Sequence, residues 1–106
     1  ERGLVTGFID ALVAYDDELW VLDYKSDSLA GDPVRTAVEH VQAHYKHQHR
    51  LYALAAHRLR GARRLGGMLF AFVRYGVTAV LPIDDAHLAD WSRWLATVRT
   101  DAEART

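Results

Sequence analysis

The stretch that decides the fold runs over residues 7–26 and reads GFIDALVAYDDELWVLDYKS. Apolar and β-branched residues fill both of its halves. Between the halves, Asp16 and Asp17 favour a turn, because short acidic side chains hydrogen-bond their own backbone. The pattern predicts two antiparallel strands, over residues 4–15 and 18–24, that are joined as a β-hairpin.

The same hairpin brings three charged side chains together. A turn centred on the two aspartates places Asp10 directly opposite Asp23. Side chains two apart in a strand share a face, so Lys25 lies beside Asp23 and Tyr24 points the other way. The two carboxylates repel each other, and a hard cation such as Mg²⁺ would remove that cost by binding them and the carbonyl of Tyr24. The alternative is a salt bridge from Lys25 to Asp10 or Asp23.

Beyond the hairpin, helical and strand patterns alternate. Asp32 and Pro33 favour a helix start, with the aspartate as N-cap and the proline in the first turn. The predicted elements that follow are a helical stretch over residues 34–60 with a break near residues 43–44, ended by Gly61, Gly66 and Gly67, then strands over 68–75 and 77–83, and a last helix capped by Asp84 and Asp85. The order β-β-α-β-β-α predicts an α/β fold: a mixed β-sheet with the hairpin at its centre and flanking helices.

Composition narrows the class of protein. The chain has 106 residues, 50% hydrophobic and 25% charged, as expected for one globular domain. It has no cysteine, which excludes disulfides, thiolate metal sites and cysteine nucleophiles and is compatible with a reducing cytoplasm. We expect no membrane partner, because no apolar run approaches the roughly 20 residues of a membrane span. The sequence does not begin with Met, so we expect it to be a piece of a longer protein.

Charge is distributed unevenly along the chain. Residues 1–34 hold two basic and eight acidic side chains, a net −6, whereas residues 35–64 hold seven basic and one acidic, a net +6. A metal-dependent site acting on a polyanion needs such a division, with carboxylates for the cation and basic residues for phosphates. The alternative is two solvated faces that neutralise each other.

Four linked motifs resemble those of the PD-(D/E)XK nucleases. They are GFID at residues 7–10, LDYKS at 22–26, QHRLY at 48–52 and GGMLFAFVR at 66–74. Their order and spacing are similar to those of the RecB-type branch, the nuclease domains of exodeoxyribonuclease V β subunits, and AddA-type helicase-nucleases are close to the same pattern. We expect residues 1–106 to form a single nuclease domain without the upstream helix that carries a further metal ligand in the family.

The resemblance implies a role for each matched residue. Asp10 and Asp23 would ligate Mg²⁺ or Mn²⁺, and Tyr24 would add its carbonyl oxygen. Lys25 would be the catalytic lysine. The remaining pair, one helical turn apart, would face the active site and help to position metal, water or DNA: Gln48 and Tyr52. For this pair the alternative is packing of the helix against the core.

The function implied by the resemblance is Mg²⁺-dependent hydrolysis of DNA phosphodiester bonds by water, in double-strand-break repair and recombination. The implied partners are DNA, the helicase part of the same parent chain, the other subunits of a RecBCD-like complex and RecA, all in the bacterial cytoplasm. The alternative is a nuclease-like module that binds DNA or RecA without catalysis. The intact set of Asp10, Asp23 and Lys25 favours the enzyme.

Other polar and aromatic clusters have structural interpretations as well as functional ones. His40 and His44 share a helix face and could bind Zn²⁺, although solvated helix histidines are more common. Trp91 and Trp94 favour core packing, with docking to another part of the protein as the alternative. Four arginines at the end of the long helix could contact phosphates or remain solvated near the helix C-terminus: Arg58, Arg60, Arg63 and Arg64.

Overall fold

The computed structural model describes residues 9–104, and the side chains of residues 9–101. Its elements along the chain are β1 (Ala11–Tyr15), β2 (Glu18–Lys25), α2 (Pro33–His44), α3 (Lys46–Leu59), β3 (Arg64–Phe72), β4 (Val77–Pro82) and α4 (Asp85–Ala104). Strands and helices alternate as predicted, except that the helical stretch is two helices. The order is therefore β-β-α-α-β-β-α, and the α/β class is confirmed.

The four strands form one mixed sheet in the order β1-β2-β3-β4. The β1–β2 and β3–β4 pairs are antiparallel, and the β2–β3 pair is parallel. Strand β1 pairs Ala11 with Leu22, so the register continued by one residue sets Asp10 opposite Asp23, as the hairpin pattern predicts. β1 begins only at Ala11, and residues 4–8 of the predicted first strand lie outside the described residues. Only β2 of the hairpin is central, because β1 forms an edge of the sheet.

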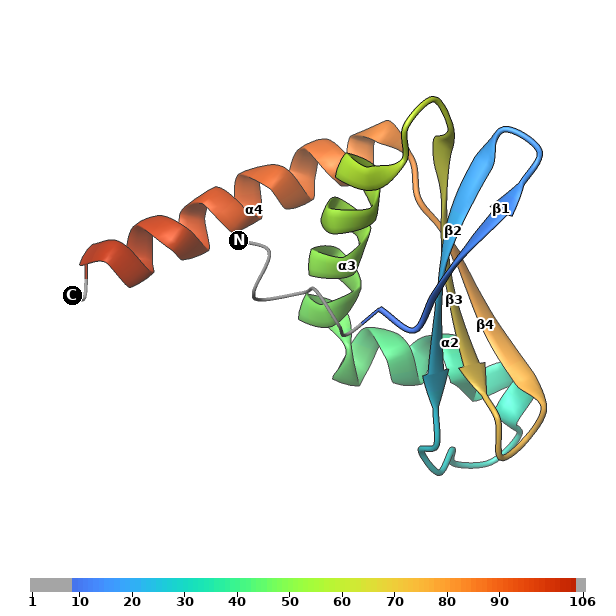
Figure 1. Cartoon of the computed structure of the whole chain (residues 1–106). Coiled ribbons are helices and arrows are strands. Elements are labelled where there is room, and N and C mark those ends of the chain that lie inside the picture. Colours follow the sequence, from blue (N-terminus) through green and yellow to red (C-terminus); the bar gives the residue numbers. More distant parts are fainter. Residues whose placement is uncertain (1–8, 105–106) are drawn as a thin grey trace.

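The break between α2 and α3 falls at Tyr45, close to the predicted position. Helix α2 begins as expected, with Asp32 as N-cap accepting a hydrogen bond from the backbone N–H of Val34 at 3.1 Å and with Pro33 as its first residue. Tyr45 closes α2 by donating its N–H to the carbonyl of Val41 at 2.7 Å, and its φ of −125° ends the helical path. The chain then turns into α3, which starts in a new direction (Figure 1).

Strand β3 starts at Arg64, four residues earlier than predicted, so Gly66 and Gly67 lie inside a strand and do not end a helix. Their role is close approach. A Cβ on Gly66 would lie 2.5 Å from the indole nitrogen of Trp20, and one on Gly67 would lie 2.5 Å from the backbone oxygen of Leu81. The glycines therefore let β2 and β4 approach β3 at this point.

Helices α2 and α3 cover one face of the sheet, and α4 leaves the body from the end of β4 (Figure 1). The centre of the core lies between this helical layer and the sheet. Its largest fully buried side chains are Phe70, Phe72, Met68, Val21 and Val41. Among the described residues, no helix is long and apolar enough to cross a membrane.

Candidate active site

Asp10 is anchored to the backbone of β2 just before β1 begins. Its Oδ2 accepts a hydrogen bond from the N–H of Tyr24 at 2.8 Å. In a strand, the N–H and C=O of one residue point to the same side, so the carbonyl of Tyr24 also faces the side of Asp10. The next residue faces the opposite side, where the carbonyl of Lys25 accepts from Val73 at 3.1 Å. A carboxylate and a carbonyl therefore meet at the open edge of β2.

Asp23 is the only buried charged residue of the described part, with 4% of its surface exposed. Its Oδ2 lies 2.8 Å from Nζ of Lys25 but has no hydrogen bond of good geometry, so the contact is an ion pair with a directional bond unfilled. Burial raises the pKa of Asp23, and the adjacent Asp10 adds to this rise. The hydrogen bond from Tyr24, and then the contact with Asp23, hold the pKa of Asp10 below its usual value.

Lys25 links the strand pair to α3. Its Nζ donates to Oε1 of Gln48 at 2.7 Å, and Nε2 of Gln48 donates to the hydroxyl of Tyr52 at 3.1 Å. Tyr52 is buried in the core with 4% exposure, so the packing alternative for this residue also holds. The structure thus brings together Asp10, Asp23, Lys25, Gln48 and Tyr52. The salt-bridge alternative is also present, because Lys25 pairs with Asp23.

Tyr45 adjoins Lys25, and Asp27 and His40 adjoin Tyr45; sequence reasoning missed this role for all three. Nζ of Lys25 lies 3.8 Å from the ring centroid of Tyr45, within cation–π range. The Tyr45 hydroxyl donates to Oδ2 of Asp27 at 2.6 Å, and Nε2 of His40 lies 2.8 Å from the same oxygen. Burial, and then Asp27, raise the pKa of Tyr45 to about 12. Tyr45 lies at the boundary between α2 and α3, outside both helices, so helix periodicity gave no signal for its contact with Lys25.

His40, a candidate zinc ligand in the sequence, is instead in contact with the Asp27 carboxylate. The ring of His40 lies 4.5 Å from that of His44 and shares Asp27 with Tyr45. Within the part of the chain that the structure describes, no group of three or more histidines and carboxylates is arranged to hold a metal. The contacts of His40 therefore support the structural interpretation.

The oxygen atoms at the hairpin fit a hard divalent cation. Asp10 and Asp23 are neighbouring carboxylates, the Tyr24 carbonyl faces the same edge, and Oδ2 of Asp23 is a buried acceptor without a hydrogen bond. Mg²⁺ and Mn²⁺ prefer such oxygen ligands, and a cation there would offset the burial and the repulsion from Asp10 that raise the pKa of Asp23. The donor set of this chain is therefore suited to either ion.

Comparison with known proteins places this geometry in a family. The model of the PD-(D/E)XK nuclease superfamily matches residues 3–106. The chain belongs to the PD-(D/E)XK nuclease superfamily. The RecBCD enzyme subunit RecB of Mycolicibacterium smegmatis is 32% identical over 111 residues, which cover 88% of this chain and 10% of that protein. RecB of Escherichia coli is 34% identical over 86 residues, which cover 69% and 7%. No solved structure matches the chain.

The similarity to RecB subunits covers a small part of those proteins, because the chain spans a tenth or less of their length. Strand β2 carries Asp23-Tyr24-Lys25, an acidic residue and a lysine with the spacing that the name of the superfamily describes. Asp10 precedes β1, and the roles of these three residues in a nuclease site stay a prediction. The resemblance seen in the sequence is thereby confirmed at the level of the family.

Four of the six remaining sequence candidates have side-chain contacts within this PD-(D/E)XK domain. Arg64 forms an ion pair with Glu18, and Arg60 donates to the carbonyl of His57 at 2.5 Å. Trp91 packs against the core as expected, and Trp94 stacks on His47 with ring centroids 5.2 Å apart. These contacts account for half of the arginine cluster and for both tryptophans.

Proposed function

We propose that this chain is the metal-dependent DNA nuclease domain of a RecB-like helicase-nuclease. It hydrolyses phosphodiester bonds during double-strand-break repair and recombination. The observation that carries the proposal is the convergence of Asp10, Asp23 and Lys25 in a member of a nuclease superfamily. A scaffold without catalysis gains nothing from a buried aspartate whose pKa is raised beside a second carboxylate.

Each residue has a defined task in this reaction. Asp10, Asp23 and the Tyr24 carbonyl would hold Mg²⁺ or Mn²⁺, which would supply a more acidic water and neutralise charge on the phosphate. Lys25 presents its ammonium group where negative charge grows during attack on phosphorus. Gln48 fixes that ammonium through the 2.7 Å hydrogen bond from Nζ to Oε1.

The positions around Lys25 support this task. Its side chain is 10% exposed and is bounded by the Asp23 carboxylate, the Gln48 amide and the Tyr45 ring. Contacts from three directions restrict the side chain before substrate arrives, and fixed charges stabilise transition states better than mobile ones. Tyr52 in turn holds the Gln48 amide.

The partners follow from the relatives. Both are named as subunits of the RecBCD enzyme, so we propose that DNA is the substrate and that the helicase part of the parent chain and the other subunits of such a complex are partners. RecA is a further proposed partner, and the bacterial cytoplasm is the proposed location.

Titration calorimetry with Mn²⁺ and Mg²⁺ tests the catalytic site directly. The parent chain is compared with Asp10→Ala and Asp23→Ala, and with Asp90→Ala as a control for removing an exposed carboxylate on α4. Binding should be lost in both hairpin variants and kept in the control, while circular dichroism shows that all four are folded. Binding that survives in both hairpin variants, or DNA cleavage unchanged in Asp23→Ala, would contradict the proposal. A parent chain that binds neither ion but binds DNA would favour the non-catalytic module.

A further inference from the structure

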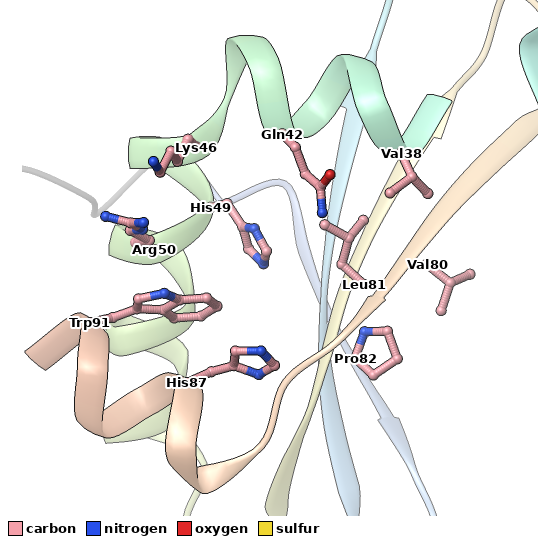
Figure 2. A pocket seen from close by; sticks show the side chains of 10 residues that line it. All are labelled: Val38, Gln42, Lys46, His49, Arg50, Val80, Leu81, Pro82, His87 and Trp91. Carbon is pink, nitrogen blue, oxygen red and sulfur yellow. The ribbon is translucent and has the colours of Figure 1, made fainter. Parts of the chain in front are cut away.

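A second site lies on the other side of α3 from Lys25. It is a cleft of about 530 Å³ between α2, α3, β4 and α4 (Figure 2). Helix α3 separates it from the catalytic cluster: Tyr45, Gln48 and Tyr52 turn toward Lys25, and the residues that follow Tyr45 and Gln48 turn toward the cleft. None of the residues assigned to catalysis lines it.

The cleft is positively charged on one side. Lys46 and Arg50, one helical turn apart on α3, lie together at this side in Figure 2. No carboxylate lines the cleft, and neither cation forms an ion pair within residues 9–101. The guanidinium of Arg50 is held 5.0 Å from the ring of Trp94. Two cations held together without a counter-ion indicate an anionic ligand.

The rest of the lining is aromatic and apolar. The Trp91 ring lies 5.0 Å from that of His49 and 5.3 Å from that of His87, and Pro82 of β4 faces them across the cleft (Figure 2). Nε2 of His49 is buried without a hydrogen bond to any described residue. A phosphate alone makes no use of such a wall, whereas a nucleotide places its base there and its phosphate on the cations.

The size of the cleft selects among nucleic acids. A volume of about 530 Å³ falls in the range of small-molecule sites and is too small for a duplex. The two sides of α3 are about 10–12 Å apart, the width of a helix with its side chains. A few nucleotides of a single strand cover a span of that size. One strand can therefore reach both sides of the helix.

We propose that this cleft binds single-stranded DNA a few nucleotides away from the catalytic site, with phosphates on Lys46 and Arg50 and a base against Trp91. The proposal rests on the proposed nuclease function and adds a second contact with the same strand. Such a contact holds the substrate by its backbone and by stacking, and both are independent of sequence.

Binding of a labelled 12-nucleotide oligo(dT) in EDTA, followed by fluorescence anisotropy, tests the cations without cleavage. The Lys46→Gln/Arg50→Gln variant should bind about tenfold more weakly. Its plot of log affinity against log salt should be shallower by about 1.4, because two phosphate contacts on a single strand contribute about 0.7 each. The control Arg93→Gln/Arg99→Gln loses the same two charges on exposed positions of α4 that do not line the cleft, and should change affinity less than twofold. Equal effects of both double variants would overturn the proposal.

The three indole N–H signals in a nitrogen–proton NMR spectrum locate the bound strand. Trp91 should shift on addition of oligo(dT), while Trp20, whose ring packs on Gly66 and Gly67, should not. Thymidine monophosphate and inorganic phosphate are added separately. If Trp91 responds fully to the mononucleotide, at the same affinity as to the oligonucleotide, the proposed single-stranded DNA ligand is overturned and the cleft is a site for a free nucleotide.

The two proposals fail separately. If the parent chain binds no metal but Trp91 shifts on addition of oligo(dT), the nuclease proposal is contradicted and the cleft proposal stands. If the parent chain binds metal at the hairpin but Trp91 does not shift, the cleft proposal is contradicted and the nuclease proposal stands.

Discussion

The two sides of α3 are built in opposite ways. On the side toward β2, the polar groups of α3 itself have partners: Gln48 accepts from Lys25 and donates to Tyr52, at 2.7 and 3.1 Å. On the cleft side, the buried Nε2 of His49 has no hydrogen bond within the described residues, and Arg50 has no carboxylate. Gln48 and His49 are consecutive in the chain and point about 100° apart around the helix. One step along α3 therefore leads from a hydrogen-bonded network, which we call closed, to a side with unpaired polar groups, which we call open.

The difference indicates how the two sides are used. A closed network fixes a catalytic cation in advance, which is what a reaction with growing negative charge requires. Unsatisfied donors and a buried nitrogen retain their capacity for hydrogen bonds until a ligand supplies the partners. We therefore expect single substitutions on the side toward β2 to lower the rate of DNA cleavage. Single substitutions on the cleft side should change the stability of the fold and its affinity for DNA.

Lys25→Met should cause the largest loss. It removes the cation on which Asp23, Gln48 and Tyr45 converge, and DNA cleavage should fall by a factor on the order of 10² to 10³. Metal binding should persist, because lysine supplies no oxygen ligand. Steady-state cleavage and Mn²⁺ calorimetry are measured on the same sample, with Arg99→Met as the control for a lost exposed charge. Cleavage at the parent's rate would mean that the closed side of α3 does not serve catalysis.

The stability of the fold should depend on pH through His49. Burial lowers the pKa of His49 from 6.5 to about 4, so the unfolded chain binds a proton that the folded chain does not. Stability is therefore complete above pH 6.5 and is lost as the pH falls toward 4. At about 1.4 kcal/mol per pKa unit, reduced for partial exposure, the loss is about 2 kcal/mol.

Urea unfolding at several pH values measures this loss. His49→Leu should flatten the decline between pH 6.5 and 4, whereas His47→Gln, which leaves the buried imidazole in place, should retain it. A decline that is the same in His49→Leu would assign the acid sensitivity to other groups and would remove the contrast between the two sides of α3.

The hairpin was predictable because its signals are local. The acidic turn and the alternating strands fix the register, and Asp16 adopts the positive φ of 54° that such a turn needs. The same arithmetic set Asp10 opposite Asp23. The break of the helical stretch was also visible, and it falls one residue after the predicted position, at Tyr45.

The parts that escaped prediction depend on contacts between distant segments. Gly66 and Gly67 looked like helix terminators, but their lack of side chains serves the packing of Trp20. The contact of Tyr45 with Lys25 and Asp27 joins a helix boundary to the loop after β2, and no pattern within one segment shows it. The cleft escaped for the same reason, since its walls come from four separate elements.

Gln48→Ala should have an intermediate effect. It removes the acceptor for the Lys25 ammonium and the donor to Tyr52, so Lys25 becomes mobile. A hydrogen bond to a charged group contributes about 1.5–3 kcal/mol, which corresponds to a kcat roughly ten- to a hundredfold lower. Gln48→Glu restores an acceptor and should recover part of kcat, which a purely structural defect would not. A change confined to KM would instead make Gln48 a contact for substrate.

The smallest effect is expected at Tyr45, and it separates the ring from the hydroxyl. Tyr45→Phe keeps the ring beneath Lys25 and loses only the hydrogen bond to Asp27, so cleavage should change less than about threefold and stability should fall by about 1 kcal/mol. Tyr45→Leu also loses the cation–π contact, which contributes about 0.5–2 kcal/mol. Leucine should therefore lower kcat further than phenylalanine, in parallel urea and cleavage measurements. Equal rates for the two variants would show that Gln48 and Asp23 hold Lys25 without the Tyr45 ring. The contacts that position Lys25 would then be its hydrogen bond to Gln48 and its ion pair with Asp23.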